Sequence, residues 1–132
     1  MTQALRIGAL LAALAAAACG PSAPLEVSSI QLGKAINPDK TVAAFTTSFA
    51  PTDTIYLVIL SPKAGKGTLS VKWMFGTRVV SEDSRQVSYT DAAATEFHLQ
   101  NAVGFPDGAY RVEVFLDGTS VGSRPYRVTS GE

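Results

Sequence analysis

The stretch GAYRVEVFLDGTSVGSRPYRV, residues 108–128, decides the fold of this chain. Its first half alternates apolar and polar side chains, the period-two pattern of a strand with one buried face. The apolar members of that pattern are Tyr110, Val112, Val114 and Leu116. Asp117-Gly118 follows and tolerates the positive φ angles that a tight hairpin turn requires. A two-stranded hairpin alone is barely stable in water, so the sequence predicts a second sheet that covers this apolar face.

The second half of the stretch is expected to form the return strand of the hairpin, but the register that the turn sets does not bury all of its apolar residues. A two-residue turn pairs Val114 with Val121 on the core face, and the same register then points Tyr126 outward. One extra residue in the return strand restores Tyr126 to the core, and proline favours such a bulge because it has no N–H to donate. We therefore predict a β-bulge near Arg124-Pro125.

Short β-prone segments separated by turn residues fill the rest of the chain after the N-terminus. Residues 54–60 are apolar on both faces, which is typical of a central strand, whereas 61–67 and 82–84 are expected to form an exposed loop and a polar turn. No segment of helical periodicity interrupts this pattern, so we predict an all-β sandwich of about seven to nine antiparallel strands. The other expected strands are 27–32, 41–49, 68–75, 78–81, 85–89 and 95–100.

Residues 27–129 resemble the small immunoglobulin-like domains of bacterial envelope lipoproteins. Trp73 lies on the strand after the central one, where such sandwiches place a core tryptophan. The segment Asp107–Tyr110 resembles the tyrosine corner at the start of the penultimate strand. Val112 stands where antibody domains carry a disulfide cysteine. The resemblance therefore implies an Ig-like β-sandwich without that bridge.

Composition limits the classes of partner. With 132 residues and 46% apolar content, the chain can form one domain with a true core. Eleven basic and eleven acidic side chains cancel, so no net charge attracts the chain to nucleic acid. The single cysteine, Cys19, cannot form an internal disulfide.

The N-terminus has the features of an export signal. Arg6 precedes an apolar run over residues 7–18, whose helical length of about 18 Å is well below the ~30 Å hydrocarbon core of a bilayer. A signal peptide over residues 1–18 is therefore favoured over a transmembrane helix. The small residues before Cys19 resemble the lipobox of bacterial lipoproteins, in which the cysteine becomes the first mature residue and carries the lipid. The alternative is an ordinary signal peptide that leaves a free thiol.

The lipobox resemblance implies a membrane partner. It implies two acyl chains on Cys19, commonly with a third on the new amino terminus, and more than one chain anchors a protein stably. Gly20 replaces the Asp associated with inner-membrane retention, so the periplasmic side of the outer membrane is the expected location. Residues 19–26, with two prolines and small polar residues, then form a lipidated tether to the domain at 27–129.

No pattern of catalytic or metal-ligating residues emerges from the sequence. His98 is the sole histidine and is expected to face outward, with no nucleophile placed to use it as a base. Glu82, Asp83 and Asp91 are too scattered for a calcium loop, which needs six or more oxygens at close spacing. We therefore expect no enzyme activity, no cofactor and no metal site.

One surface is a candidate for binding. If strands 68–75 and 110–116 are neighbours in one sheet, their outward side chains share a face that includes Lys72, Met74, Arg111 and Phe115. Met, Phe and Arg are enriched at protein interfaces, although isolated exposed apolar residues are also normal. This face predicts a role in binding another envelope protein or a structural accessory role. The alternative is a small-ligand or glycan carrier that uses loops at one end of the sandwich, such as 61–67 and 101–107.

Overall fold

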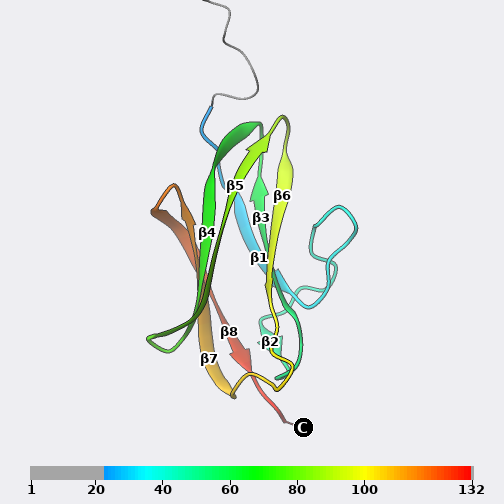
Figure 1. The fold of residues 1–132 in the computed structure, drawn as a ribbon. Helices are drawn as coiled ribbons and strands as arrows, with labels where there is room; N and C mark the ends of the chain where they lie inside the picture. Colours follow the sequence, from blue (N-terminus) through cyan, green and yellow to red (C-terminus); the bar gives the residue numbers. More distant parts are fainter. Residues whose placement is uncertain (1–22, 132) are drawn as a thin grey trace, which may run out of the picture.

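The computed structural model describes residues 23–131, which form eight strands in two sheets packed face to face (Figure 1). The strands are β1 (Ser29–Gly33), β2 (Ser48–Phe49), β3 (Ile55–Ser61), β4 (Gly65–Phe75), β5 (Arg78–Tyr89), β6 (Ala93–Leu99), β7 (Gly108–Leu116) and β8 (Thr119–Val128). One sheet has the order β1-β3-β6 and the other β2-β8-β7-β4-β5. The predicted all-β sandwich is confirmed. None of the described residues belongs to a helix long and apolar enough to cross a membrane.

The core lies between the two sheets and is built from the predicted alternating side chains. The central strand β3 contributes Ile55, Leu57 and Ile59, which are completely buried. Trp73 of β4 is 1% exposed, and its ring meets Tyr126 edge-on at 6.3 Å between centroids. Burial of such side chains contributes about 1.5–3 kcal/mol each, so the facing sheets are the main source of stability. The other large buried members include Leu69, Val71, Phe97, Val112, Val114 and Val128.

The β7–β8 hairpin has the predicted turn and a bulge at a different place. Asp117 and Gly118 both have positive φ angles, 51° and 86°, as a tight hairpin turn requires. The register shifts between Val114, which pairs with Gly122, and Phe115, which pairs with Ser120. The extra residue is therefore Val121, and the bulge predicted near Arg124-Pro125 is wrong in position.

Gly122 explains why the bulge lies beside the turn. Its φ of 152° lies in the region that favours glycine, and a Cβ there would stand 2.9 Å from the end of the Ile30 side chain. The bulge still returns Tyr126 and Val128 to the core, where they are 2% and 1% exposed. Pro125 is accommodated opposite Arg111 without a bulge of its own.

The tyrosine corner is confirmed. The hydroxyl of Tyr110 donates a hydrogen bond of 2.6 Å to the carbonyl oxygen of Pro106, four residues upstream. The ring of Tyr110 stacks between Phe75 at 4.4 Å and Tyr126 at 5.3 Å. This contact fixes the loop that enters β7 against the start of that strand.

Two segments that were predicted to be a turn and a loop belong wholly or partly to strands. The predicted turn at 82–84 continues one twelve-residue strand, β5, in which Glu82 pairs with Lys72 and Ser84 with Ser70. Because β5 is the edge of its sheet and largely exposed on both faces, its polar side chains remain hydrated. The predicted loop at 61–67 is also shorter, since β3 runs through Ser61 and β4 starts at Gly65.

The segment 41–49 joins the two sheets, as expected for an edge or sheet-switching strand. Phe45 forms an isolated bridge with Gly33 at the end of β1. The chain then crosses to the five-stranded sheet, where Ser48 and Phe49 of β2 run parallel to the end of β8. Only these last two residues are a strand, and Phe49 is 2% exposed in the core.

The chain before β1 contributes to the domain. Leu25, expected in the tether, is 2% exposed and belongs to the core. Its amide donates to the carbonyl oxygen of Lys66, and the Lys66 amide donates to that of Ala23, at 2.9 and 3.0 Å. Pro24 thus forms a parallel bridge with Lys66 beyond the end of β7. The packed domain therefore includes these residues, whereas the expected signal peptide and Cys19 lie outside the described residues.

Gly65 makes this docking testable. A Cβ at Gly65 would stand 2.8 Å from the Cα of Leu25 and from the carbonyl oxygen of Pro24, which are both backbone atoms that cannot rotate away. We expect Gly65→Ala to displace the docked segment and to speed amide exchange at Leu25 by about tenfold or more, a loss of about 1.4 kcal/mol of local protection. Hydrogen exchange followed by mass spectrometry measures this.

Gly67→Ala on the same strand is the matched control. Its Cβ would meet the end of the Leu116 side chain at 2.9 Å, and a side-chain end can move. We expect exchange at Leu25 to stay unchanged in this variant. Equal exchange in both variants would contradict the docking of residues 23–25.

Two arginines close the open sides of the sandwich. Arg85 of β5 donates from Nη1 to the carbonyl oxygen of Glu96 on β6 at 2.8 Å, with its guanidinium 4.3 Å from the Phe97 ring centroid. On the other side, Arg124 of β8 donates from Nε to the carbonyl oxygen of Ile30 on β1 at 3.0 Å. Because β1 and β6 are the two edges of the smaller sheet, each arginine joins one of those edges to the larger sheet.

Candidate functional site

The four predicted interaction residues lie on one face of the larger sheet, pointing away from the core. β4 and β7 are antiparallel neighbours, with Met74 opposite Arg111 and Ser70 opposite Phe115. The intervening residues of β4, Val71 and Trp73, are buried on the other side. The premise that the two strands are adjacent is therefore confirmed, and the candidate interaction face is defined here as Lys72, Met74, Arg111 and Phe115.

Arg111 covers Met74. Its Nη2 lies 3.2 Å from the Met74 sulfur, and its Nη1 donates to a carboxylate oxygen of Glu113 at 3.3 Å. The other Glu113 oxygen accepts a 2.8 Å hydrogen bond from the Ser120 hydroxyl on β8. These contacts hold the guanidinium over the thioether, so Met74 is half-buried in the free protein.

Lys72 lies over Phe115 in a similar way. Its ammonium nitrogen is 5.5 Å from the centre of the Phe115 ring, within the range of a cation–π contact worth about 0.5–1 kcal/mol at an exposed site. Phe115 is half-buried as a result. The candidate interaction face therefore consists of two soft apolar groups, each lying against one cationic side chain.

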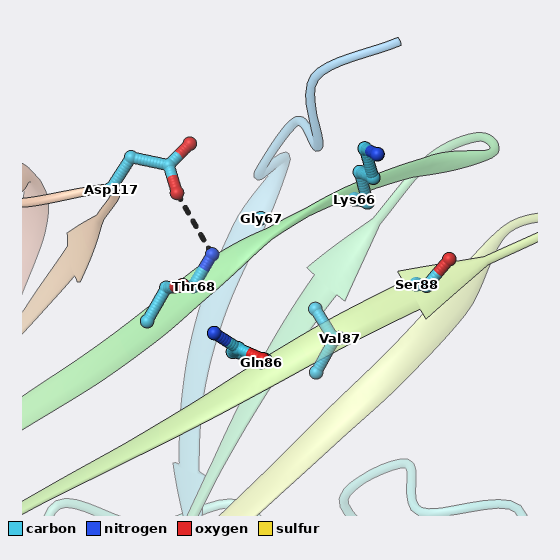
Figure 2. Close-up of a pocket in the computed structure, with 7 residues that line it drawn as sticks. All are labelled: Lys66, Gly67, Thr68, Gln86, Val87, Ser88 and Asp117. Atoms are coloured by element: carbon cyan, nitrogen blue, oxygen red, sulfur yellow. Dashed lines mark hydrogen bonds between the residues drawn. The ribbon is translucent and has the colours of Figure 1, made fainter. Parts of the chain in front are cut away.

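Open hollows adjoin this face on the side of β5. One, of about 490 Å³, runs between β4 and β5 from Ser70 and Ser84 to Phe115 and Gly118. A second, of about 620 Å³, lies beyond the hairpin turn and is lined by Lys66, Gly67, Thr68, Gln86, Val87, Ser88 and Asp117 (Figure 2). Both are shallow, and hydroxyl, amide and charged groups from two strands line much of their surface.

Asp117 lines the second hollow, and one of its carboxylate oxygens is already hydrogen-bonded within the fold. Its carboxylate accepts a 2.9 Å hydrogen bond from the Thr68 amide, which Figure 2 marks, and its own amide donates to the Thr68 carbonyl at 2.9 Å. These bonds continue the β4–β7 ladder past its last pair, Leu69 with Leu116. The carboxylate thus has a structural role at the turn.

His98 lies on the outer face of the smaller sheet. Its side chain is 56% exposed, and Nδ1 is 2.6 Å from a carboxylate oxygen of Glu96, two residues earlier on β6. The Tyr56 ring on β3 is 5.7 Å away. An exposed pair of this kind contributes about 0–1 kcal/mol, and its neighbours are those of a surface histidine.

The loops proposed for a ligand carrier do not meet. Ser61 pairs with Ala93 and Ile55 with Leu99, so the turn after β3 and the loop after β6 lie at opposite ends of the sandwich (Figure 1). The interpretation that placed 61–67 and 101–107 at one end is therefore wrong. Across residues 23–131, no three His, Cys, Asp or Glu side chains gather in a way that could hold a metal ion.

Comparison with known proteins shows the fold. No family model and no curated protein matches this sequence. The structure is similar to an immunoglobulin-like protein from Pseudomonas aeruginosa, with a TM-score of 0.56, 11% identity, and coverage of 83% of this chain and 100% of that one. The chain has an Ig-like fold. Its larger sheet contains the strand order β8-β7-β4. This order matches strands G, F and C, which form one of the two sheets of an immunoglobulin domain.

Weaker similarities reach parts of larger enzymes. A β-glucosidase from Listeria innocua in complex with glucose superposes with a TM-score of 0.48 and 12% identity over 79% of this chain and 16% of the enzyme. A β-glucosidase from Erythrobacter marinus gives 0.49 and 8% over 80% of this chain and 15% of the enzyme. The chain thus spans less than a fifth of either enzyme, and these matches assign no activity to it.

Proposed function

We propose that this chain is a lipid-anchored, non-catalytic Ig-like module of the bacterial cell envelope that binds another envelope protein. The candidate interaction face carries the proposal: Met74 and Phe115 lie on the same face of one sheet, on either side of the Lys72–Glu113 pair, and each has a cation beside it. Lys72 forms no ion pair within 4.0 Å among the described residues, although Glu82 and Glu113 are its neighbours on the two adjoining strands. A partner surface with apolar groups and a carboxylate complements this face.

The docked N-terminal segment adds an orientation to the proposal. Four residue steps separate Cys19 from Ala23, a span of at most about 14 Å when fully extended. A lipid on Cys19 would therefore hold the domain close to the bilayer, with the turn at 62–64 toward the membrane. The loop at 101–107 lies at the other end (Figure 1). The candidate interaction face runs along the side between these ends.

Loss of partner capture tests the interaction face. We expect Met74→Ser with Phe115→Ser to abolish capture of the partner by a photo-crosslinking residue placed at Ser84, which is exposed on the neighbouring strand. Each side chain is only half-buried, so the thermal midpoint should fall by a few degrees at most, as for about 1 kcal/mol. Crosslinking in intact cells, followed by mass spectrometry of the adduct, measures the outcome.

Phe45→Ser is the matched control because Phe45 is an aromatic residue that is 66% exposed on a loop away from this face. Capture should be unchanged in that variant. Undiminished capture in the Met74/Phe115 variant would remove this face from consideration. A glycan or small-ligand carrier would instead show a raised thermal midpoint when glycans are added.

Intact-mass analysis of the membrane fraction tests the anchor separately. A mature species that begins at Cys19 with added acyl mass is the expected result, and Cys19→Ser should shift the protein out of that fraction. A species that begins at residue 19 with an unmodified thiol would overturn the lipid anchor and leave the interaction face untouched.

A further inference from the structure

A separate hollow is lined by residues that flank the β4–β5 turn and by the loop that enters β7. Figure 1 shows these two segments at the end of the sandwich opposite residue 23. The hollow has a volume of about 260 Å³. Its apolar wall is rigid, because Phe75 and Tyr110 stack at 4.4 Å and Phe105 meets Tyr110 edge-on at 6.3 Å. The hydroxyl of Tyr110 is held by Pro106, so it presents no free donor to the hollow. The floor of this hollow is therefore aromatic and preformed.

The rim of this hollow is a β-bulge that exposes two adjacent valines. The β4–β5 register shifts between Trp73, which pairs with Ser81, and Met74, which pairs with Val79, so Val80 is the extra residue. Val79 and Val80 are 42% and 38% exposed and both line the hollow. Bulges at sheet edges commonly re-aim a side chain, and this one places a second apolar group at the rim.

Arg78 supplies the only charge among the residues that line the hollow. Its guanidinium lies 5.7 Å from the centre of the Phe75 ring. No carboxylate oxygen lies within 4.0 Å of it in the part of the chain that the structure describes, where the four ion pairs all involve other residues. A guanidinium beside an apolar hollow recognises a carboxylate next to an apolar group.

The backbone beside the hollow limits the shape of the occupant. Val79 and Val80 belong to β5, the edge strand of the larger sheet, which pairs with β4 on one side only. An edge strand has unpaired N–H and C=O groups with which an extended segment can pair. Farther along β5, the Arg85 side chain bonds to β6, so the first residues of β5 are the accessible part of this edge.

We propose that this end of the domain binds an extended segment of another protein, with one apolar side chain in the hollow and an adjacent Asp or Glu on Arg78. The segment pairs with the edge of β5 beside Val80, the hollow takes a side chain of leucine or phenylalanine size, and Arg78 sets the register. This site shares no residue with the candidate interaction face, which it borders where Val79 pairs with Met74, and it does not depend on the lipid.

Selection from a phage-displayed library of random nonapeptides, against the full chain in detergent micelles, tests the proposal. The enriched peptides should share an apolar residue next to Asp or Glu. Synthetic versions should bind Val79→Ser/Val80→Ser at least about tenfold more weakly. Arg78→Glu should lose the same peptides and bind versions in which Lys replaces the acidic residue.

Val121→Ser is the matched control, because Val121 is a 39% exposed valine at the other bulge of the same sheet, and it should bind the peptides normally. Circular dichroism checks that the variants remain folded. The proposal is overturned if no acidic–apolar peptide is enriched, or if enriched peptides bind the double valine variant normally. It is also overturned if peptide binding is lost with Met74→Ser/Phe115→Ser instead, or if sedimentation shows that a second copy of the chain occupies the hollow.

Discussion

Replacing Arg85 and Arg124 together by alanine is expected to lower the free energy of unfolding by about 3 kcal/mol. Each arginine donates a charge-assisted hydrogen bond to a carbonyl oxygen on an edge strand of the opposite sheet, at 2.8 and 3.0 Å. Such bonds contribute about 1.5–3 kcal/mol, and partial solvent exposure reduces each to about 1–2 kcal/mol. The two sites lie on opposite sides of the sandwich and share no partner, so their effects should add. Urea unfolding measures the sum.

Arg127→Ala provides the control for loss of a β8 arginine. Arg127 is exposed on the same strand, and its side chain makes no hydrogen bond to any described residue, so the change should stay within about 0.5 kcal/mol. Domains of this size have a stability of about 5–15 kcal/mol, so a loss of 3 kcal/mol is easily resolved. A double variant as stable as Arg127→Ala would show that the packed core alone holds the sheets together.

The hairpin at 108–128 could be predicted from sequence because its signals are local. Alternation assigned the faces of β7, and Asp117-Gly118 marked the turn that both positive φ angles confirm. The need for a bulge also followed from the pattern, since Tyr126 had to reach the core. Its position did not follow, because it coincides with the positive φ of Gly122, 152°, and the alternation of the strand does not indicate which residue takes that conformation.

Edge elements were the least predictable part of the fold. β5 has polar residues at 82–84, and a polar run is typical of both a turn and an exposed edge strand. Only its pairing with β4 distinguishes the two. Leu25 was similarly hidden in a segment with two prolines, where composition favours a linker. Its burial depends on a backbone bridge to Lys66, which no local pattern indicates.

The candidate interaction face followed from one topological assumption, whereas the hollow at the end did not. Neighbouring strands place Met74 and Phe115 on one face in any register that buries Val71 and Val112. The hollow instead depends on where Phe105 and Tyr110 meet the start of β5. The adjacent valines 79 and 80, which break the alternation of an edge strand, were the one sequence signal that pointed to it.

Tyr110→Phe and Tyr126→Phe should change stability in opposite directions, although the two rings stack 5.3 Å apart. Tyr110→Phe removes the 2.6 Å hydrogen bond to Pro106, for an expected loss of about 1–2 kcal/mol. The buried hydroxyl of Tyr126 has no hydrogen-bond partner among the described residues, so its removal should raise the free energy of unfolding by up to about 1 kcal/mol. Thermal and urea unfolding at pH 7 compare the two variants, each being the control for the other. A loss on Tyr126→Phe equal to that on Tyr110→Phe would show that the Tyr126 hydroxyl has a stabilising partner after all, whereas an unchanged stability of Tyr110→Phe would contradict the tyrosine corner.

Tyr110→Phe and Tyr126→Phe should also differ in how their free energy of unfolding depends on pH above 9. Burial raises the pKa of the Tyr126 hydroxyl far above its ordinary value near 10, with a further contribution from Tyr110. The unfolded chain therefore releases the Tyr126 proton near pH 10 while the folded chain retains it, so stability falls as the pH rises above 10 and until the folded pKa is reached. Tyr126→Phe removes this proton, so its stability should fall less steeply than that of the natural protein, by up to about 1.4 kcal/mol per pH unit. Desolvation also raises the Tyr110 pKa, so Tyr110→Phe should lose this contribution and the smaller part that Tyr110 adds to the Tyr126 pKa, and should retain the part that comes from burial of Tyr126. If the free energy of unfolding falls equally with pH in the natural protein and in Tyr126→Phe between pH 9 and 11.5, this hydroxyl reaches solvent in the folded protein. Only a hydrated hydroxyl ionises at the same pH in the folded and the unfolded chain.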